Sequence, residues 1–177
     1  MQFEKTDIEG IWVITPKVFE DQRGYFMETF IRKAFETYVG PVDFVQENES
    51  LSRFGVTRGL HFQKEPYAQS KLIRVVKGRI FDVAVDIRPD SPTCGRHFCI
   101  ELSHVNKKQL FIPGGFAHGF CVQSREALVQ YKTDVPYTPE AEGAFRYDSP
   151  ALDIRWPLSQ EKMILSAKDM AAPLFSY

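Results

Sequence analysis

Apolar and polar side chains alternate through the central part of the chain, which is the pattern of half-buried β-strands. After a Lys-Gly pair at residues 77–78, every second position is apolar, at Phe81, Val83, Val85 and Ile87. The Lys-Gly pair itself predicts a hairpin turn between two strands within residues 71–93. Further short strand patterns follow at regular spacing, in residues 98–103, 108–113, 117–124 and 126–133. This spacing predicts an antiparallel β-sandwich or β-barrel.

Together with the elements predicted near the two ends of the chain, these strands predict a fold that is mainly β with a few short helices. Residues 10–19 predict a strand interrupted at Pro16, which a sheet tolerates at an edge or a bulge. Residues 25–30 predict another short strand. Helix patterns are brief and lie in residues 32–39 and 159–170. Because no repeat, low-complexity tract or long linker divides the 177 residues, residues 1–177 predict a single domain.

Composition and charge argue against several classes of function. Hydrophobic residues make up 44% and charged residues 25%, which is ordinary for a globular protein in water. The net charge is −1, so the overall field predicts neither nucleic acid nor an anionic membrane as a partner. We see no signal peptide and no apolar stretch of transmembrane length. The three cysteines are an odd set without a CxxC pair, which favours a reducing compartment and predicts a cytoplasmic protein.

Residues 55–63, GVTRGLHFQ, place an arginine and a histidine in a strand pattern. Arg58 and His61 either face water or line a polar cavity inside a barrel, and the segment alone leaves both interpretations open. His118 follows a Pro-Gly-Gly turn, where loops often carry function. Single histidines do not make a metal site here, since His61 is followed by Gln63 and the ligand set stays short of the three or four that zinc or iron prefers.

Other polar residues have ordinary structural explanations when each is taken alone. Residues 166–169, SAKD, match a helix capping box with Ser166 as the N-cap and Asp169 three residues later. Lys71 opens a strand and is typical of a protected sheet edge. Tyr131 is a common strand aromatic. None of these residues identifies a function by itself.

Several of these segments, in this order, resemble one enzyme family along nearly the whole chain. The sequence is similar to the dTDP-4-dehydrorhamnose 3,5-epimerases in FEDQRGYFMETF, QENESLSRFGVTRGLHFQ, KLIRVVKGRIFDVAVDIRPDSPTCG, LFIPGGFAHGF, YKTDVPYTPEAEGAFRYDSPALDIRWP and LSAKD. Thr57, Val135 and Tyr147 depart from the usual pattern, which concerns details of the sugar pocket. The resemblance implies a cupin-type jelly-roll barrel whose interior holds the ligand, so that inward polar residues face a cavity.

The implied activity is epimerisation at C3 and C5 of dTDP-4-dehydro-6-deoxy-D-glucose to dTDP-4-dehydro-L-rhamnose, in dTDP-L-rhamnose biosynthesis. Both hydrogens lie α to the C4 carbonyl, so their removal gives an enolate and no cofactor or metal is implied. The resemblance makes His61 the base and Asp169 the partner that orients it. Tyr131 becomes the acid on the opposite face, and Lys71 stabilises the enolate oxygen.

The same resemblance assigns the residues that bind the dTDP-sugar. Arg23, Arg58 and Lys168 meet the diphosphate, where guanidinium and ammonium groups suit phosphate oxygens. The other implied contacts to nucleoside or sugar come from Phe26, Glu28, Gln46, Asn48, His118, Tyr137 and Glu142. Some of them are expected from a neighbouring subunit, because the resemblance implies a homodimer that exchanges N-terminal strands.

Two alternatives remain open at the sequence level. One is an epimerase that acts on a single centre, C3 or C5, of a related dTDP-4-keto-deoxyhexose. The other is a non-catalytic cupin that binds a nucleotide sugar. The second is disfavoured because a binding protein does not need an acid and base pair.

Overall fold

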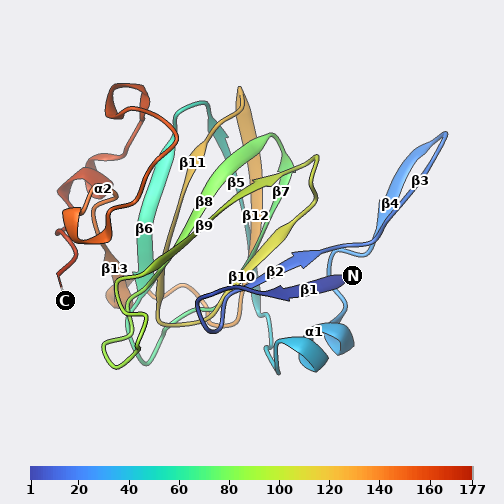
Figure 1. The fold of residues 1–177 in the computed structure, drawn as a ribbon, viewed down its shortest axis with the longest axis horizontal. Coiled ribbons are helices and arrows are strands. Elements are labelled where there is room, and N and C mark those ends of the chain that lie inside the picture. Colours follow the sequence, from blue (N-terminus) through green and yellow to red (C-terminus); the bar gives the residue numbers. More distant parts are fainter. Residues whose placement is uncertain (177) are drawn as a thin grey trace.

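The computed structural model describes residues 1–176 and consists mainly of two antiparallel β-sheets that face each other (Figure 1). The six-stranded sheet has the order β1 (Gln2–Lys5), β2 (Trp12–Thr15), β10 (Gln109–Ile112), β7 (Lys71–Lys77), β12 (Glu126–Thr133), β5 (Gln46–Arg53). The five-stranded sheet has the order β13 (Glu142–Ala144), β6 (Thr57–Gln63), β11 (Phe116–Val122), β8 (Arg79–Asp86), β9 (His97–Ser103). The predicted antiparallel β architecture is therefore confirmed.

Helical elements are few and short, as the sequence predicts. Helix α1 (Arg32–Tyr38) lies beside the six-stranded sheet and buries Phe35 against Leu72 and Phe111. The remaining helical elements are α2 (Ala167–Ala171) and the 3₁₀ turns Pro139–Ala141, Pro150–Leu152 and Gln160–Lys162. No helix in residues 1–176 is long and apolar enough to cross a membrane.

The predicted hairpin turn at residues 77–78 is wrong. Strands β7 and β8 belong to different sheets, so the chain crosses from one sheet to the other at this point. Gly78 has a φ of +82°, and a Cβ built there would lie 2.0 Å from the carbonyl oxygen of Glu126. A tight corner between sheets needs the same short connection and left-handed glycine as a hairpin. The local sequence therefore does not distinguish the two.

The main apolar core lies between the two sheets. It includes Ile73 of β7 and Leu110 of β10 on one side, and Ile80 of β8 and Val122 of β11 on the other. A second cluster covers the outer face of the five-stranded sheet, where Val83 and Leu60 contact the C-terminal segment through Leu152 and Phe175. This packing fixes the C-terminal segment, which carries α2, against β6.

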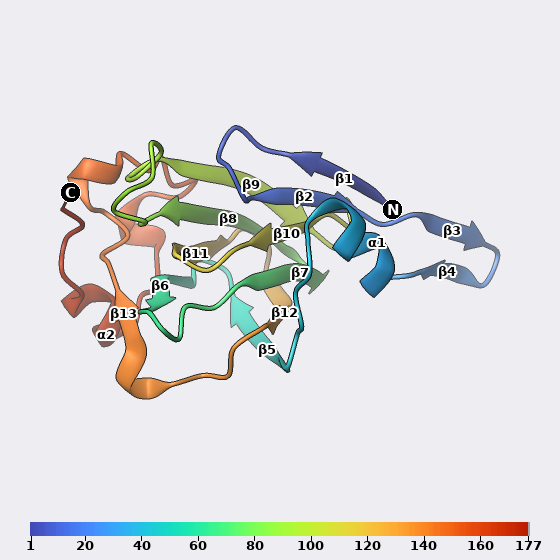
Figure 2. The same cartoon turned by 90° about the horizontal axis from the view of Figure 1, so that it is seen from below.

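Strands β3 (Val18–Asp21) and β4 (Gly24–Met27) form a separate two-stranded sheet. The break between β2 and β3 lies at Pro16, as predicted. Figures 1 and 2 show this hairpin projecting away from the two large sheets. Its aromatic side chains are exposed, at 49% for Phe19, 52% for Tyr25 and 65% for Phe26. The hairpin thus presents an apolar surface that its own chain leaves largely uncovered.

Candidate active site

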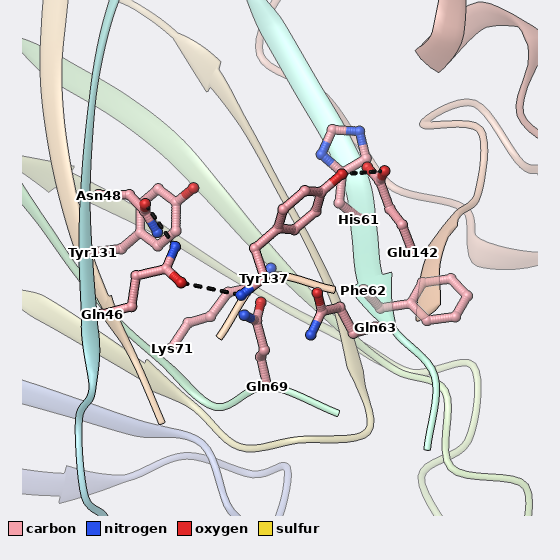
Figure 3. A pocket seen from close by; sticks show the side chains of 10 residues that line it. All are labelled: Gln46, Asn48, His61, Phe62, Gln63, Gln69, Lys71, Tyr131, Tyr137 and Glu142. Atoms are coloured by element: carbon pink, nitrogen blue, oxygen red, sulfur yellow. Dashed lines mark hydrogen bonds between the residues drawn. The ribbon is translucent and has the colours of Figure 1, made fainter. Parts of the chain in front are cut away.

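A cavity of about 240 Å³ opens between the two sheets. Figure 3 shows the side chains that line it, which are Gln46, Asn48, His61, Phe62, Gln63, Gln69, Lys71, Tyr131, Tyr137 and Glu142. A second hollow of about 150 Å³ shares His61, Lys71 and Tyr131 with it and adds Arg58 and His118. The three residues that the resemblance predicts for catalysis besides Asp169, which are His61, Lys71 and Tyr131, therefore line both hollows.

The period-two pattern explains why polar groups reach the interior. On β8, Asp82 lies between Ile80 and Ala84 on the face that contributes to the inner core. Lys71 occupies the same face of β7 as Ile73. Because these strands continue from an apolar core into a polar end, their inward side chains form the walls of the cavity. Of the two environments that the sequence leaves open for His61, the cavity is the one observed.

His61 pairs with Asp169 across 108 residues of sequence. Its Nε2 lies 2.5 Å from Oδ1 of Asp169, and Asp169 is only 4% exposed. Burial lowers the pKa of His61 from its usual 6.5, while the hydrogen bond and charge of Asp169 oppose that shift. The charges of Lys71 and His118 lower it further. A neutral imidazole near neutral pH is the form that accepts a proton.

Asp169 also fulfils the capping role that the sequence predicts. The hydroxyl of Ser166 accepts a hydrogen bond from the Asp169 backbone N–H at 3.0 Å, so it caps α2. The capping contact and the contact to His61 occur together, because the capping bond uses the Asp169 backbone and the bond to His61 uses its carboxylate.

Lys71 and Tyr131 belong to the six-stranded sheet, opposite His61 on β6. Burial lowers the pKa of Lys71 to about 8, although the charges of Asp82 and Glu142 act against this. Burial raises the pKa of Tyr131 above 10, with a smaller opposing effect from Arg58. Figure 3 shows Tyr131 and His61 on opposite walls. An imidazole, a phenol and an amine therefore face one space.

Tyr137 extends across the mouth of the cavity (Figure 3). Its hydroxyl donates to Oε2 of Glu142 at 2.8 Å, and Lys168 Nζ donates to the same oxygen at 2.6 Å. The Lys168 ammonium lowers the pKa of Glu142. The backbone N–H of Tyr137 donates to Gln46 Oε1 at 3.0 Å, and Gln46 Nε2 donates to Asn48 Oδ1 at 2.9 Å. These contacts join β5, the loop that carries Tyr137, β13 and α2 at the cavity entrance.

Several residues of the site were missed at the sequence level. Asp82 is fully buried, and each of its carboxylate oxygens lies 3.0 Å from Nε2 of His118. Buried Gln63 accepts from the Thr138 backbone N–H at 2.6 Å, and Gln69 donates to the Val135 carbonyl at 2.6 Å. The two glutamines therefore anchor the segment that carries Tyr137. A polar residue at an inward strand position is the signal that points to Asp82 and Gln63, whereas Gln69 lies in the connection between β6 and β7 and has no such signal.

Three predicted binding residues lie away from the cavity of their own chain. Arg23 and Phe26 sit on the projecting β3–β4 hairpin, and exposed Glu28 follows it. Arg23 pairs with Asp21 at 2.5 Å, and the Arg23 side chain is 90% exposed. Arg58 and Lys168, in contrast, line one crevice of about 310 Å³ together with His61. Two of the three cations predicted to bind a diphosphate thus lie beside His61, whereas Arg23 is remote within one chain.

The interpretation of Tyr147 as a sugar-pocket position is wrong. Tyr147 is 6% exposed and packs against Trp156 with ring centroids 6.1 Å apart. It belongs to the C-terminal covering layer and does not line the cavity between the sheets. Thr57 is buried, at 1% exposed, on the strand that carries His61. The Val135 carbonyl accepts hydrogen bonds from Gln69 and Thr133.

No group of three or more His, Cys, Asp or Glu side chains in residues 1–176 is arranged to hold a metal ion. The site brings together an imidazole paired with a carboxylate (His61 and Asp169), a phenol (Tyr131) and an ammonium group (Lys71). Side chains of these types can transfer protons and stabilise developing negative charge.

Comparison with known proteins identifies relatives along the whole chain. Residues 5–177 match the family model of dTDP-4-dehydrorhamnose 3,5-epimerase. The chain is 50% identical to the dTDP-4-dehydrorhamnose 3,5-epimerase of Shigella flexneri over 99% of this chain and 96% of that protein.

The similar solved structures are also epimerases in complex with deoxysugar nucleotides. The fold is similar to dTDP-6-deoxy-D-glucose-3,5-epimerase from Legionella pneumophila in complex with dTDP-4-keto-L-rhamnose. The TM-score is 0.94 and the identity 46%, over 98% of this chain and 92% of the other. A 3′-monoepimerase from Streptomyces bikiniensis in complex with dTDP-quinovose is also similar, with a TM-score of 0.89 and 30% identity over 96% of this chain and 85% of the other.

Proposed function

The chain belongs to the dTDP-4-dehydrorhamnose 3,5-epimerase family, and from this membership we propose how its site carries out the family reaction. It is an isomerase with the cupin jelly-roll fold. Its reaction is the epimerisation at C3 and C5 of dTDP-4-dehydro-6-deoxy-D-glucose to dTDP-4-dehydro-L-rhamnose, a step of dTDP-L-rhamnose biosynthesis. The observation that supports our assignment of roles is the meeting of His61, Lys71 and Tyr131 in one cavity, with Asp169 bonded to His61.

Proton abstraction is the role of His61. Its Nε2 is engaged by Asp169, so Nδ1 is the nitrogen that accepts the proton from C3 or C5. Asp169 holds this tautomer and stabilises the imidazolium that forms. The electron pair of the broken C–H bond moves toward O4, where the Lys71 ammonium stabilises the enolate. Tyr131 then gives its proton to the opposite face of the same carbon, which inverts the centre, and solvent restores both groups.

The nucleotide occupies the entrance side of the cavity. Arg58 and Lys168 lie in the crevice beside His61 and bind the diphosphate. Arg58 is held by Ser52, whose hydroxyl accepts from Nε at 3.2 Å. Tyr137, Gln46, Asn48 and Glu142 then contact the nucleoside and the sugar at the cavity mouth, and His118 contacts the sugar from the floor.

We further propose that the protein is a homodimer in which each β3–β4 hairpin reaches the partner. Phe19, Tyr25 and Phe26 are exposed on a hairpin that makes its own small sheet. Strand β5 lies at the edge of the six-stranded sheet and carries Gln46 and Asn48. An unpaired strand edge is a template for another chain, so the hairpin of one protomer adds beside β5 of the other. Arg23, Phe26 and Glu28 of one protomer then face the cavity of its partner.

Complementation between subunits tests this arrangement. The variants Arg23→Ala and His61→Ala are each expected to be inactive or weakly active as homodimers. Mixing after unfolding and refolding gives heterodimers in which one cavity has both an intact base and an intact hairpin. Activity that returns on mixing supports the exchange, whereas mixtures no more active than the two parents contradict it. A cytoplasmic location also remains a proposal, and cell fractionation tests it.

The activity itself is tested by proton NMR of dTDP-4-dehydro-6-deoxyglucose with the purified protein in deuterated buffer. Loss of both the C3 and C5 proton signals is expected for a double epimerase. Loss of only one signal assigns the protein to the single-centre alternative. The similarity to a 3′-monoepimerase is the observation that favours testing this alternative. Absence of exchange at both carbons, with dTDP still bound, identifies a nucleotide-sugar-binding protein. His61→Ala is the matched control, because it removes the base and is expected to retain dTDP binding.

A further inference from the structure

The carboxylate that pairs with His61 has a second partner on its other oxygen. The hydroxyl of Ser166 donates to Asp169 Oδ2 at 2.8 Å, while His61 Nε2 lies 2.5 Å from Asp169 Oδ1. The same serine oxygen accepts from the Asp169 backbone N–H at 3.0 Å. Ser166 therefore holds both the backbone and the side chain of the aspartate.

These contacts constrain the carboxylate more than the helix does. Helix α2 has only five residues, so its own hydrogen bonds fix little, and the capping contact contributes much of its order. A carboxylate held at one oxygen still rotates about its last torsion. Hydrogen bonds to both oxygens, from His61 on one side and Ser166 on the other, fix the plane of the carboxylate and with it the direction of the imidazole.

We propose that Ser166 is a positioning residue for proton abstraction, which acts on His61 through Asp169. Its hydroxyl orients the carboxylate and takes up part of the negative charge that Asp169 presents to His61. The expected effect on turnover rests on the proposed function, whereas the effect on the protonation of His61 does not.

The sign of the effect follows from the charges. Asp169 favours the protonated form of His61 and burial disfavours it. Without the Ser166 donor, the full carboxylate charge acts on the imidazole, so the pKa of His61 rises. Less of the neutral base is then present on the acidic side of the profile. Loss of orientation lowers turnover in addition, at every pH.

Three substitutions separate this role from simple helix capping. Ser166→Thr keeps both the donor and the capping acceptor. Ser166→Ala removes both. Ser166→Gly also lacks the donor, but glycine is a far better helix N-cap than alanine and adds no charge beside Asp169. If capping alone matters, the glycine variant stays close to the wild type, and if the donor matters, it resembles the alanine variant.

Two measurements are made on each variant. The first is the NMR titration of His61, one of only four histidines, assigned with His61→Gln. The second is the pH profile of kcat/KM with dTDP-4-dehydro-6-deoxyglucose, together with kcat at the optimum. For both the alanine and glycine variants we expect kcat to fall roughly three- to tenfold, the scale of one ordinary hydrogen bond. We also expect the His61 titration and the acidic limb to move to higher pH, with the threonine variant close to the wild type.

The control is Ser159→Ala, since Ser159 precedes the turn Gln160–Lys162 without making a side-chain cap and should leave both measurements unchanged. A glycine variant that matches the wild type in kcat and titration overturns the proposal, as does an unmoved His61 titration in the alanine variant. If the wild type itself fails to exchange C3 and C5 protons, the proposed function fails. The titration then still decides the inference about Ser166.

Discussion

The alkaline limit of turnover should report the protonation of Lys71. Burial lowers the pKa of this lysine from 10.5 to about 8, and this difference corresponds to about 3 kcal/mol in favour of the neutral amine. The charges of Asp82 and, to a smaller extent, Glu142 act in the opposite direction. Stabilisation of the enolate oxygen requires the ammonium form. Lys71 therefore begins to lose its positive charge only slightly above neutral pH.

The expected profile of kcat/KM follows from that pKa. At pH 7 about nine-tenths of Lys71 carries its charge, and at pH 9 only about one-tenth does. We therefore expect kcat/KM to fall above pH 8, approaching a tenfold loss for each further pH unit. On the acidic side, His61 must be neutral, and its pKa lies below 6.5. The result is a bell whose acidic limb has its midpoint below pH 6.5 and whose alkaline limb has its midpoint near pH 8.

The assay is kcat/KM from about pH 5.5 to about pH 10, with circular dichroism at each pH to confirm that the protein stays folded. Asp82→Asn removes the larger stabilising charge while keeping the side-chain volume, so the alkaline limb should move to lower pH. Glu142→Gln should move it in the same direction by less. In Lys71→Arg the guanidinium stays charged throughout this range, so any residual activity should lack the limb near pH 8.

Two results would refute this reasoning. A limb that begins only above pH 10 belongs to a group such as Tyr131, whose pKa is raised above 10, and not to Lys71. A limb near pH 8 that persists in Lys71→Arg assigns the titration to another group.

Two further predictions concern the acid and the segment at the cavity mouth. Tyr131→Phe keeps the base, so exchange of the C3 and C5 protons in deuterated buffer should continue. The amount of inverted product should fall at least tenfold. Both are measured by NMR, and equal losses of exchange and inversion would contradict the acid role. Gln63→Ala removes the partner of the Thr138 backbone N–H and should lower the free energy of unfolding by about 1–3 kcal/mol, measured by urea denaturation. It should also raise KM, because the segment bearing Tyr137 loses an anchor, and an unchanged KM would show that the segment is held by other contacts.

Much of the fold follows from the sequence because period two is a local property. Each strand shows its buried face within a few residues, as at Phe81 and Val83, and the breaks at Pro16 and Gly40 limit the elements at either side. Which strands pair is not local. Residues 71–77 and 79–86 look like two arms of a hairpin, yet they enter different sheets.

The site residues likewise fall into those that the local pattern places and those that depend on distant packing. Lys71 and His61 sit on strands, so the inward direction of their side chains follows from the pattern once the barrel is known. Asp169 reaches His61 only because the C-terminal segment docks on the outer face of the five-stranded sheet through Leu152 and Phe175. Nothing in residues 166–169 encodes that docking. The local pattern gives the cap correctly, and the resemblance to a family was needed to identify the partner of the carboxylate.

We propose that one base serves two centres because Lys71 holds the sugar by its O4 oxygen. In a 4-keto sugar C3 and C5 lie symmetrically about the C4–O4 bond, so a site that fixes O4 leaves both carbons at similar distances from the base. Rotation of the ring about that bond exchanges C3 and C5 in front of His61 without releasing the nucleotide. Lys71→Met, which removes the charge and keeps the apolar stem, should then slow proton exchange at C3 and C5 by the same factor. If exchange at only one carbon slows in the NMR experiment, the two centres use different anchors, and the shared-anchor explanation fails.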